Sequence, residues 1–493
     1  MDNELSKKNK RAFSSGCTGR DLSYTLVSLF FLTFVQFTCS LTQEQFTVLS
    51  IIIIGCRVWD AVNDPMMSTI ITNTKSRFGR YKPWILIGSI VNSLFLVGLF
   101  LSPGLSEWGY VAYLGVMYLL WGMTFTMNDV SYWSMIPHLA KSKDARDKLT
   151  GYVAIFASVG QFVSGGLVPI LTTGNMVNAY RMYAIISAII FVACQVMVFL
   201  LVDDKDTTQV EKNVTLKEMF KIIFNNKQLL IMAVVVLFYS LASSLLTSFG
   251  TNFFYFKFGY DGTYMTIFTV VFALGTLISQ FLFQVISSKF TRAQLIKAST
   301  ILLVIGYIIF FALANMPLSW FGGNKFLYLA ILCVFGCIIF AGQGIFYLTM
   351  LIMLTNTIEY DEWKTGTRNE AISFSLRPFM VKLSSALQQG VLTVFLIITG
   401  LYSITEQFSK LEADKAAGTL TDITEQANAL FASANTWQIF GFTIGMCLIP
   451  VILFIIQHIL IKKKYIIDEK FYDQMIKEIA ERNEYEDNYG SKN

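Results

Sequence analysis

Hydrophobic residues form twelve long stretches along the chain, and shorter polar stretches separate them. Each hydrophobic stretch has about the 20 mostly apolar residues that a helix needs to cross a bilayer, or more. The predicted spans cover residues 22–42, 46–73, 83–103, 108–140, 149–174, 179–202, 228–258, 262–287, 293–316, 325–358, 370–403 and 436–461. The pattern therefore predicts an all-α polytopic membrane protein with 12 transmembrane helices.

The longest charged interruption, residues 203–227, leaves six predicted spans on each side. We therefore predict a six-helix N-terminal half at 1–202, a cytoplasmic linker at 203–227, a six-helix C-terminal half at 228–461 and a cytoplasmic tail at 462–493. A short repeat agrees with duplication, because SRFGR at 76–80 and SKFTR at 288–292 each follow the second span of their half. Two such halves are what a rocking carrier needs, with its solute site near the midplane.

Composition and charge agree with a membrane protein. The chain is 54% hydrophobic and 14% charged, whereas soluble domains carry about a quarter charged residues. Lys and Arg gather in the loops at 75–82 and 141–148, while the loops at 41–46 and 104–109 have none. By the positive-inside rule both termini are cytoplasmic in a cell membrane, inner or plasma. Topology explains the net charge of +5, so we expect a lipid bilayer and no nucleic acid as partner.

Segments outside the spans offer little chemistry. We expect a surface helix within 404–434, an amphipathic helix in the tail, and an uncleaved N terminus. The seven cysteines lie mostly in apolar stretches without paired or metal-ligand spacing, which favours small core residues over disulfides.

Carboxylates stand in the middle of the second span. Asp60 and Asp64 are four residues apart and Asn63 is three from Asp60, so their oxygens share one helix face. Burying both charges costs several kcal/mol unless a cation or a proton compensates. Arg57, one turn earlier, offers a purely structural alternative, a buried ion pair that fixes helix packing. One arginine leaves a second carboxylate over, which favours a functional site.

The fourth span adds more oxygen ligands. Thr126, Asp129 and Trp133 share a face at spacings of three and seven residues. Hard cations prefer carboxylate, amide and hydroxyl oxygens. Protonation of the carboxylates is the alternative, because desolvation and mutual repulsion raise a carboxyl pKa. The predicted cation site, for Na⁺ or H⁺, comprises Asp60, Asn63, Asp64, Thr126 and Asp129.

Aromatic and basic residues extend the candidate site. Trp133 beside Asp129 has the make-up of a sugar subsite, an aromatic face next to a hydroxyl acceptor, although plain helix packing is the alternative. In the eleventh span Lys382 lies too deep to snorkel, so we expect a carboxylate partner on the second or fourth span. Arg377 is nearer the start of that span, where the cytoplasmic surface is an alternative location.

Four sequence blocks resemble the glycoside–pentoside–hexuronide:cation symporters, the melibiose permease-like family. The blocks are DAVNDPMM, NTKSRFGRYKPWILIG, YLLWGMTFTMNDVSYWSMIP and EYDEWKTGTRNEAISFS followed by Lys382. The resemblance implies a major facilitator fold, alternating access, and symport of a sugar or glycoside with Na⁺, Li⁺ or H⁺. We expect a monomer with no cofactor beyond the co-transported ion.

The resemblance also implies residue roles. Matches to the family's cation ligands are Asp60, Asn63, Asp64 and Thr126, with Asp129 at the junction with the sugar. Departures from the melibiose permease lie in the sugar pocket: Ala154 replaces an arginine, Tyr347 a tryptophan and Phe125 a tyrosine, and Arg377 is an additional cation. A different glycoside is therefore expected, including a pentoside or an anionic uronide. The predicted substrate residues are Asp21, Phe125, Asp129, Trp133, Tyr347, Arg377 and Lys382.

Two other functional classes, lysolipid carriers and non-transporting sensors, remain as alternatives, and a third class, enzymes, is disfavoured. Lysolipid carriers share the implied fold, but a lipid path favours a more apolar cavity. A non-transporting sensor is a second alternative, because carriers and sensors share folds. An enzyme is disfavoured, because the only histidines are His138 and His458 and no nucleophile or metal constellation stands out.

Overall fold

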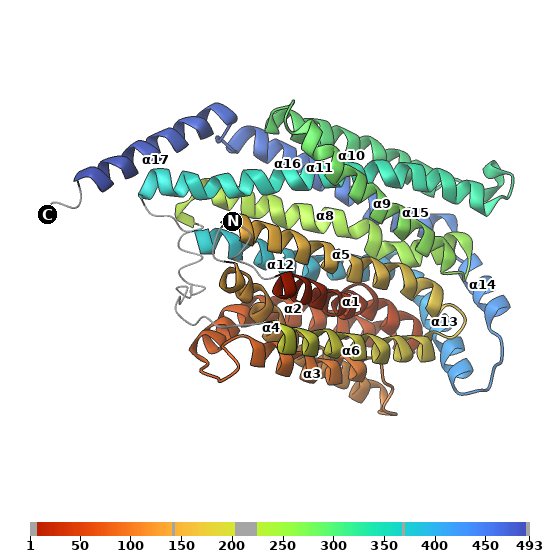
Figure 1. The fold of residues 1–493 in the computed structure, drawn as a ribbon. Coiled ribbons are helices and arrows are strands. Elements are labelled where there is room, and N and C mark those ends of the chain that lie inside the picture. Colours follow the sequence, from red (N-terminus) through yellow and green to blue (C-terminus); the bar gives the residue numbers. More distant parts are fainter. Residues whose placement is uncertain (1–6, 141–142, 203–223, 367–369, 490–493) are drawn as a thin grey trace. The chain divides into compact units, whose positions relative to one another are not determined.

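The computed structural model describes residues 7–140, 143–202, 224–366 and 370–489, which are nearly all helical (Figure 1). The elements are α1 (Lys7–Thr38), α2 (Gln43–Asn73), α3 (Lys82–Leu99), α4 (Glu107–Leu139), α5 (Lys143–Thr172), α6 (Met176–Leu201), α8 (Lys227–Phe258), α9 (Thr263–Ile286), α10 (Arg292–Ala314), η1 (Leu318–Phe321), α11 (Lys325–Thr365), α12 (Glu370–Ile398), α13 (Leu401–Ala416), α14 (Thr424–Ala432), α15 (Thr436–Thr443), η2 (Ile444–Leu448), α16 (Ile449–Lys464) and α17 (Glu469–Tyr489). In the described part, 12 helices are long and apolar enough to cross a membrane. This confirms the predicted fold class.

The chain divides into two compact units. The first comprises Met1–Asn213, Ser248–Val270 and Gln389–Phe442, and the second comprises Val214–Thr247, Val271–Gln388 and Thr443–Asn493. Helices α8, α9 and α12 therefore contribute to both units. The division at residues 203–227 into two six-helix halves stays a prediction.

In the first unit, α1 packs between α5 and α6, while α2 and α3 pack against α4. Close backbone contact holds α1 in place. A Cβ at Gly160 of α5 would collide with the carbonyl oxygen of Thr18, and a Cβ at Gly19 would lie 2.8 Å from that of Ile190 on α6. Small residues of this kind let membrane helices approach each other closely. The two glycines thus fix where α1 lies along α5 and α6. Arg20 and Asp21 directly follow Gly19, and Gln161 directly follows Gly160.

The first helix begins fifteen residues earlier than predicted, at Lys7 rather than residue 22. The prediction was wrong because the polar N-terminal sequence has no continuous apolar run. In the fold its polar side chains are covered by neighbouring helices, and Arg20 and Asp21 are 2% and 7% exposed. Two charged residues consequently lie inside the helical bundle of this unit.

In the second unit, α10 packs against α11 and α16, and the tail helix α17 packs against α11. Trp363 at the end of α11 donates its indole N–H to Glu478 at 2.6 Å. Arg482 donates to the backbone oxygen of Glu362 at 2.8 Å, which satisfies a carbonyl near the end of α11. Met475 and Ile479 are buried, so the predicted amphipathic tail helix is confirmed.

Candidate functional site

Helix α2 presents its polar residues to α4, the helix against which it packs. Asp60 and Asn63 are buried, at 4% and 7% exposure, and Asp64 is half-buried. Pro65 follows within the helix, which nevertheless continues to Asn73. The apolar run before these residues anchors α2 in the membrane, and the i, i+3 and i+4 spacing places the oxygens along one seam.

The seam between α2 and α4 brings together three of the five predicted cation ligands: Asp60, Asp64 and Thr126. The Thr126 hydroxyl donates to Asp64 Oδ1 at 3.2 Å. One turn earlier on both helices, a Cβ at Gly122 would collide with Asp60 Oδ1, so only glycine leaves room for that carboxylate. Two carboxylates and a hydroxyl therefore line one seam, a donor set that suits a hard monovalent cation.

Arg57 is completely buried beside this seam, among aromatic rings. Its guanidinium lies 3.9 Å from Asp60 Oδ2 and donates to the Tyr24 hydroxyl at 3.4 Å. The rings of Tyr118 and Trp121 have their centroids 5.3 and 5.5 Å from the guanidinium carbon, within cation–π range. The long distance to Asp60 makes this a loose ion pair. The structural alternative therefore rests on one long contact with Asp60.

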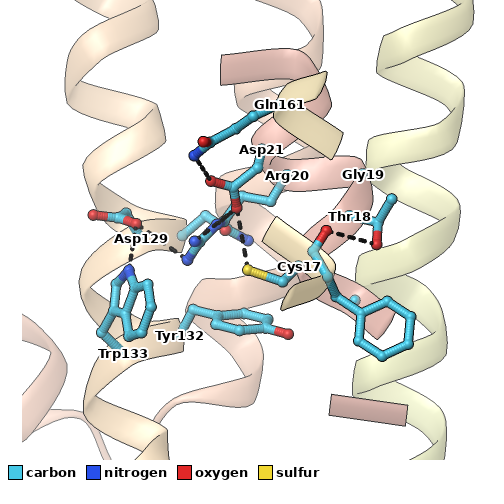
Figure 2. A network of polar contacts seen from close by, with 12 residues as sticks. Cys17, Thr18, Gly19, Arg20, Asp21, Asp129, Tyr132, Trp133 and Gln161 are labelled. Carbon is cyan, nitrogen blue, oxygen red and sulfur yellow. Dashed lines mark hydrogen bonds and ion pairs between the residues drawn. The ribbon is translucent and has the colours of Figure 1, made fainter. Parts of the chain in front are cut away.

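A second cluster centres on Arg20 of α1 (Figure 2). The guanidinium bridges two carboxylates, with Nη2 at 2.8 Å from Asp21 Oδ2 and Nη1 at 3.1 Å from Asp129 Oδ1. Trp133 donates its indole N–H to the same Asp129 oxygen at 3.0 Å. One positive charge thus holds two negative charges from different helices, and an aromatic face borders them.

Further donors fix the buried carboxylate of this cluster. Gln161 of α5 donates to Asp21 Oδ1 at 3.1 Å, and the Cys17 thiol donates to Asp21 Oδ2 at 3.1 Å. The side chain of Asp129 is 27% exposed and Trp133 is 40% exposed. The cluster therefore has a fixed inner side at Asp21 and an accessible side formed by Asp129 and Trp133.

Three members of the Arg20 cluster were missed from the sequence: Arg20, Cys17 and Gln161. Arg20 stood in the stretch interpreted as an N-terminal tail, although an Arg-Asp pair directly before an apolar run was an available signal. Nothing in the sequence singles out Cys17 or Gln161 among other helical residues. Asp129, predicted for both cation and substrate, makes its described ion pair with Arg20.

The two clusters are one helical turn apart on two helices. On α4, Thr126 contacts the cation seam and Asp129 contacts Arg20. On α1, Asp21 belongs to the Arg20 cluster, while Tyr24 contacts Arg57. Residues three apart on a helix are neighbours, so α1 and α4 each join both clusters.

The remaining predicted substrate residues are distributed between the units. Phe125 lies in the first, with its ring 4.7 Å from that of Tyr24. Tyr347, Arg377 and Lys382 lie in the second. There Arg377 donates to the Tyr347 hydroxyl, and Tyr347 stacks on Tyr239 at 5.5 Å. Lys382 is half-buried on α12. Its pairing with a carboxylate of the second or fourth span stays a prediction.

Twelve apolar helices with charged side chains enclosed among them are the architecture of a polytopic membrane protein. The sequence matches the family described as MFS/sugar transport protein over residues 12–469. The chain belongs to this family, which confirms the resemblance to glycoside–pentoside–hexuronide:cation symporters and the major facilitator fold.

Relatives with assigned activities are bacterial carriers. The lactose permease of Lactobacillus delbrueckii subsp. bulgaricus is 27% identical over 416 residues, which is 80% of this chain and 63% of that protein. The raffinose carrier protein of Pediococcus pentosaceus is 28% identical over 79% of this chain and 62% of its own length. The chain thus spans less than two thirds of either relative.

Solved structures give the same fold. The crystal structure of a bacterial homologue of the human lysosomal transporter Spinster, inward-facing and unoccupied, has a TM-score of 0.64 at 12% identity, covering 94% of this chain and 98% of that one. At this identity the likeness extends to the fold alone.

Proposed function

We propose that the protein is a secondary active symporter that couples uptake of a neutral glycoside to inward movement of Na⁺ or H⁺ by alternating access. The observation that carries the proposal is the Arg20 guanidinium bridging Asp21 and Asp129 beside the accessible face of Trp133. The lactose and raffinose carriers among the relatives support a sugar as the solute.

The carboxylates of the Arg20 cluster favour a neutral sugar over an anionic one. The Arg20 guanidinium contacts two of them, Asp21 and Asp129. Such a cluster accepts hydrogen bonds from sugar hydroxyls, and the Trp133 ring covers an apolar pyranose face. It repels a carboxylate ligand. An anionic uronide would have to rely on Arg377 and Lys382 of the second unit, and a neutral pentoside fits the same argument as a hexoside.

The cation seam also brings carboxylates close together. Asp60 and Asp64 lie one turn apart on α2, and the contact of Arg57 with Asp60 is 3.9 Å long. A Na⁺ or Li⁺ ion held by these carboxylates with Asn63 and Thr126 would offset their mutual repulsion, and so would a proton. The ion would be a co-transported substrate. We propose no other cofactor, a monomeric carrier in the cell membrane, and cytoplasmic termini as the positive-inside rule indicates.

Uptake into right-side-out membrane vesicles tests the proposal. Labelled lactose, a neutral pentoside, a glucuronide and a lysolipid are offered with and without a Na⁺ gradient or a pH gradient. We expect uphill accumulation of a neutral glycoside that needs one of the two gradients. Arg20→Ala should abolish it, whereas Arg11→Ala, near the start of α1 and outside both clusters, should not.

Other results would select the alternatives. Preference for the glucuronide would overturn the charge argument. Uptake of lysolipid alone would identify a lipid carrier of the same fold. Binding of a glycoside without counterflow would identify a sensor.

A further inference from the structure

Helix α13 carries a buried carboxylate that neither cluster uses. In sequence the helix lies between the apolar spans Leu376–Ile398 and Thr436–Lys464 and belongs to neither. Its buried side chains, which include Leu401, Thr405, Phe408 and Glu412, recur along one face. Glu412 is 0% exposed, and burial raises the pKa of its carboxyl group. A buried carboxylate is tolerated only with good hydrogen-bond partners.

The partners of Glu412 come from two distant segments. Oε2 accepts a hydrogen bond from the backbone N–H of Met176 at 2.9 Å, and Oε1 accepts one from the Tyr260 hydroxyl at 2.5 Å. Met176 begins α6, whose N-cap residue Asn175 makes no side-chain cap bond. Glu412 therefore caps α6 from another helix, at the end where the helix dipole favours a negative charge. Tyr260 lies in the turn between α8 and α9.

Ring contacts extend the same junction. Phe408 of α13 packs against Phe37 of α1 at 5.6 Å and against Tyr260 at 4.9 Å. At the start of α13, the Tyr402 hydroxyl donates to the backbone oxygen of Leu41 at 2.8 Å. Helix α13 thus covers the ends of α1, α2 and α6, against which it packs.

Helix α14 completes the cover. Phe431 is 1% exposed, and its ring packs 5.0 Å from that of Phe408. Asn428 accepts a hydrogen bond from the backbone N–H of Tyr260 at 2.9 Å. We call residues 401–432 the outer cap; Figure 1 shows its two helices in blue, labelled α13 and α14.

The outer cap joins segments that a rocking carrier has to separate. Met176 and Leu41 belong to the first six spans, whereas Tyr260 and the cap itself belong to the last six. All of them lie within the first compact unit, so the cap contacts both repeats there. Alternating access requires that contacts between the two repeats at one end break when that end opens. The hydrogen bond from Met176 to Glu412 is such a contact, and the one from Tyr260 orients the same carboxylate from within the last six spans.

We propose that Glu412 is the latch of an outer gate: oriented by Tyr260, it holds the outer cap against the start of α6 while the carrier is closed to the outside, and releases α6 when the carrier opens outward. The proposal rests on the proposed carrier function and its orientation. Glu412 is a positioning residue, because it acts on the cap and not on the sugar or the cation.

Thiol labelling from outside the cell measures how often the cap lifts. A reporter cysteine replaces Ala427, which is 0% exposed in α14, in a Cys39→Ser background that removes the thiol nearest the cap. We expect Glu412→Ala, which removes both hydrogen bonds, to speed labelling by a membrane-impermeant maleimide by more than about tenfold, the effect of losing one hydrogen bond to a charged group. Tyr260→Phe should act in the same direction, and Glu412→Gln should restore slow labelling.

Three controls separate the latch from other effects. Ala417→Cys, at an exposed position after α13, must label at one rate in every background, which also tests the orientation. Glu406→Gln changes a carboxylate of α13 that pairs with Lys410, and it should leave the reporter rate unchanged. If Glu412→Ala does not fold, Tyr260→Phe takes its place as the test variant, since it retains the packed ring.

Transport gives the second readout. A released latch favours the outward-open state, so the KM for external glycoside should fall together with the maximal rate, whereas a merely misfolded fraction would lower the rate alone. Unchanged labelling in both Glu412→Ala and Tyr260→Phe would overturn the latch. Absence of glycoside uptake by the unmodified protein would overturn the proposed function and leave the labelling result intact.

Discussion

A single guanidinium, that of Arg20, organises the candidate sugar cluster. It is 2% exposed and contacts carboxylates of α1 and α4. Breaking a buried ion pair by removing one partner typically costs about 3–5 kcal/mol, because the other charge stays buried without compensation. The charge of Arg20 is therefore a structural requirement of this cluster as well as part of its chemistry.

At the cation seam, the residue whose charge matters most is Asp64. We predict that Asp64→Asn abolishes gradient-driven accumulation, because an amide neither releases a proton nor attracts a cation as a carboxylate does. The glycoside should still equilibrate across the membrane by counterflow. Uptake in energised vesicles measures the first effect and exchange in de-energised vesicles the second. Asp414→Asn, on the exposed side of α13, is the control, and normal uphill uptake by Asp64→Asn would contradict the cation assignment.

Individual site residues differed in how far the sequence could reveal them. Spacing predicted a shared face for Asp60, Asn63 and Asp64 on the second span and another for Thr126, Asp129 and Trp133 on the fourth. The structure joins the two faces by the hydrogen bond between Thr126 and Asp64. Arg20 and Gln161 were missed because they contact carboxylates of other helices, Asp129 on α4 and Asp21 on α1. The spacing of residues along one helix does not predict which residues of other helices they contact.

Among the helical elements, the seam between α2 and α4 is closely packed at Gly122. We predict that Gly122→Ala weakens cation binding, because its methyl group would occupy the space of the Asp60 carboxylate. Overpacking of this kind typically costs about 1–3 kcal/mol of stability. Calorimetric titration with Na⁺ and the thermal unfolding midpoint measure the two effects. Gly151→Ala, where a Cβ meets no atom within 4 Å, is the matched control, and equal Na⁺ affinity in both variants would refute the constraint.

Hydrophobicity predicted the membrane-spanning segments, but it did not predict where a helix continues into polar sequence. The twelve spans were predictable because a bilayer demands long apolar segments. The first helix extends into polar sequence because α5 and α6, not lipid, cover its start. The segment predicted as a surface helix is two helices, α13 and α14, whose inner face is buried. The notion that it carries no chemistry rested on its polar composition, which does not reveal that Glu412 is fully covered.

At the scale of the whole molecule, coupling of solute and ion requires communication between the two clusters. Helices α1 and α4 each supply a residue to both. We predict that Tyr24→Phe, which retains the ring and removes only the hydroxyl that contacts Arg57, reduces the cooperativity between glycoside and Na⁺. Coupled sites typically change each other's affinity by about 5- to 150-fold, and the factor should fall towards one.

The glycoside dissociation constant, measured with and without saturating Na⁺, gives this factor directly. Tyr113→Phe is the control, because it removes a hydroxyl of α4 that bonds the Gly98 carbonyl far from both clusters in sequence. An unchanged factor in Tyr24→Phe, with both ligands still bound, would exclude this route of communication.

The close contacts of α1 also predict which positions vary among related proteins. Any side chain larger than hydrogen at Gly19 or Gly160 collides with the backbone of a neighbouring helix, so we expect both glycines to be retained among related carriers. Gln161 and Trp133 contact the Arg20 cluster through their side chains. We therefore expect carriers with different assayed sugars to differ at these two positions more often than at the two glycines.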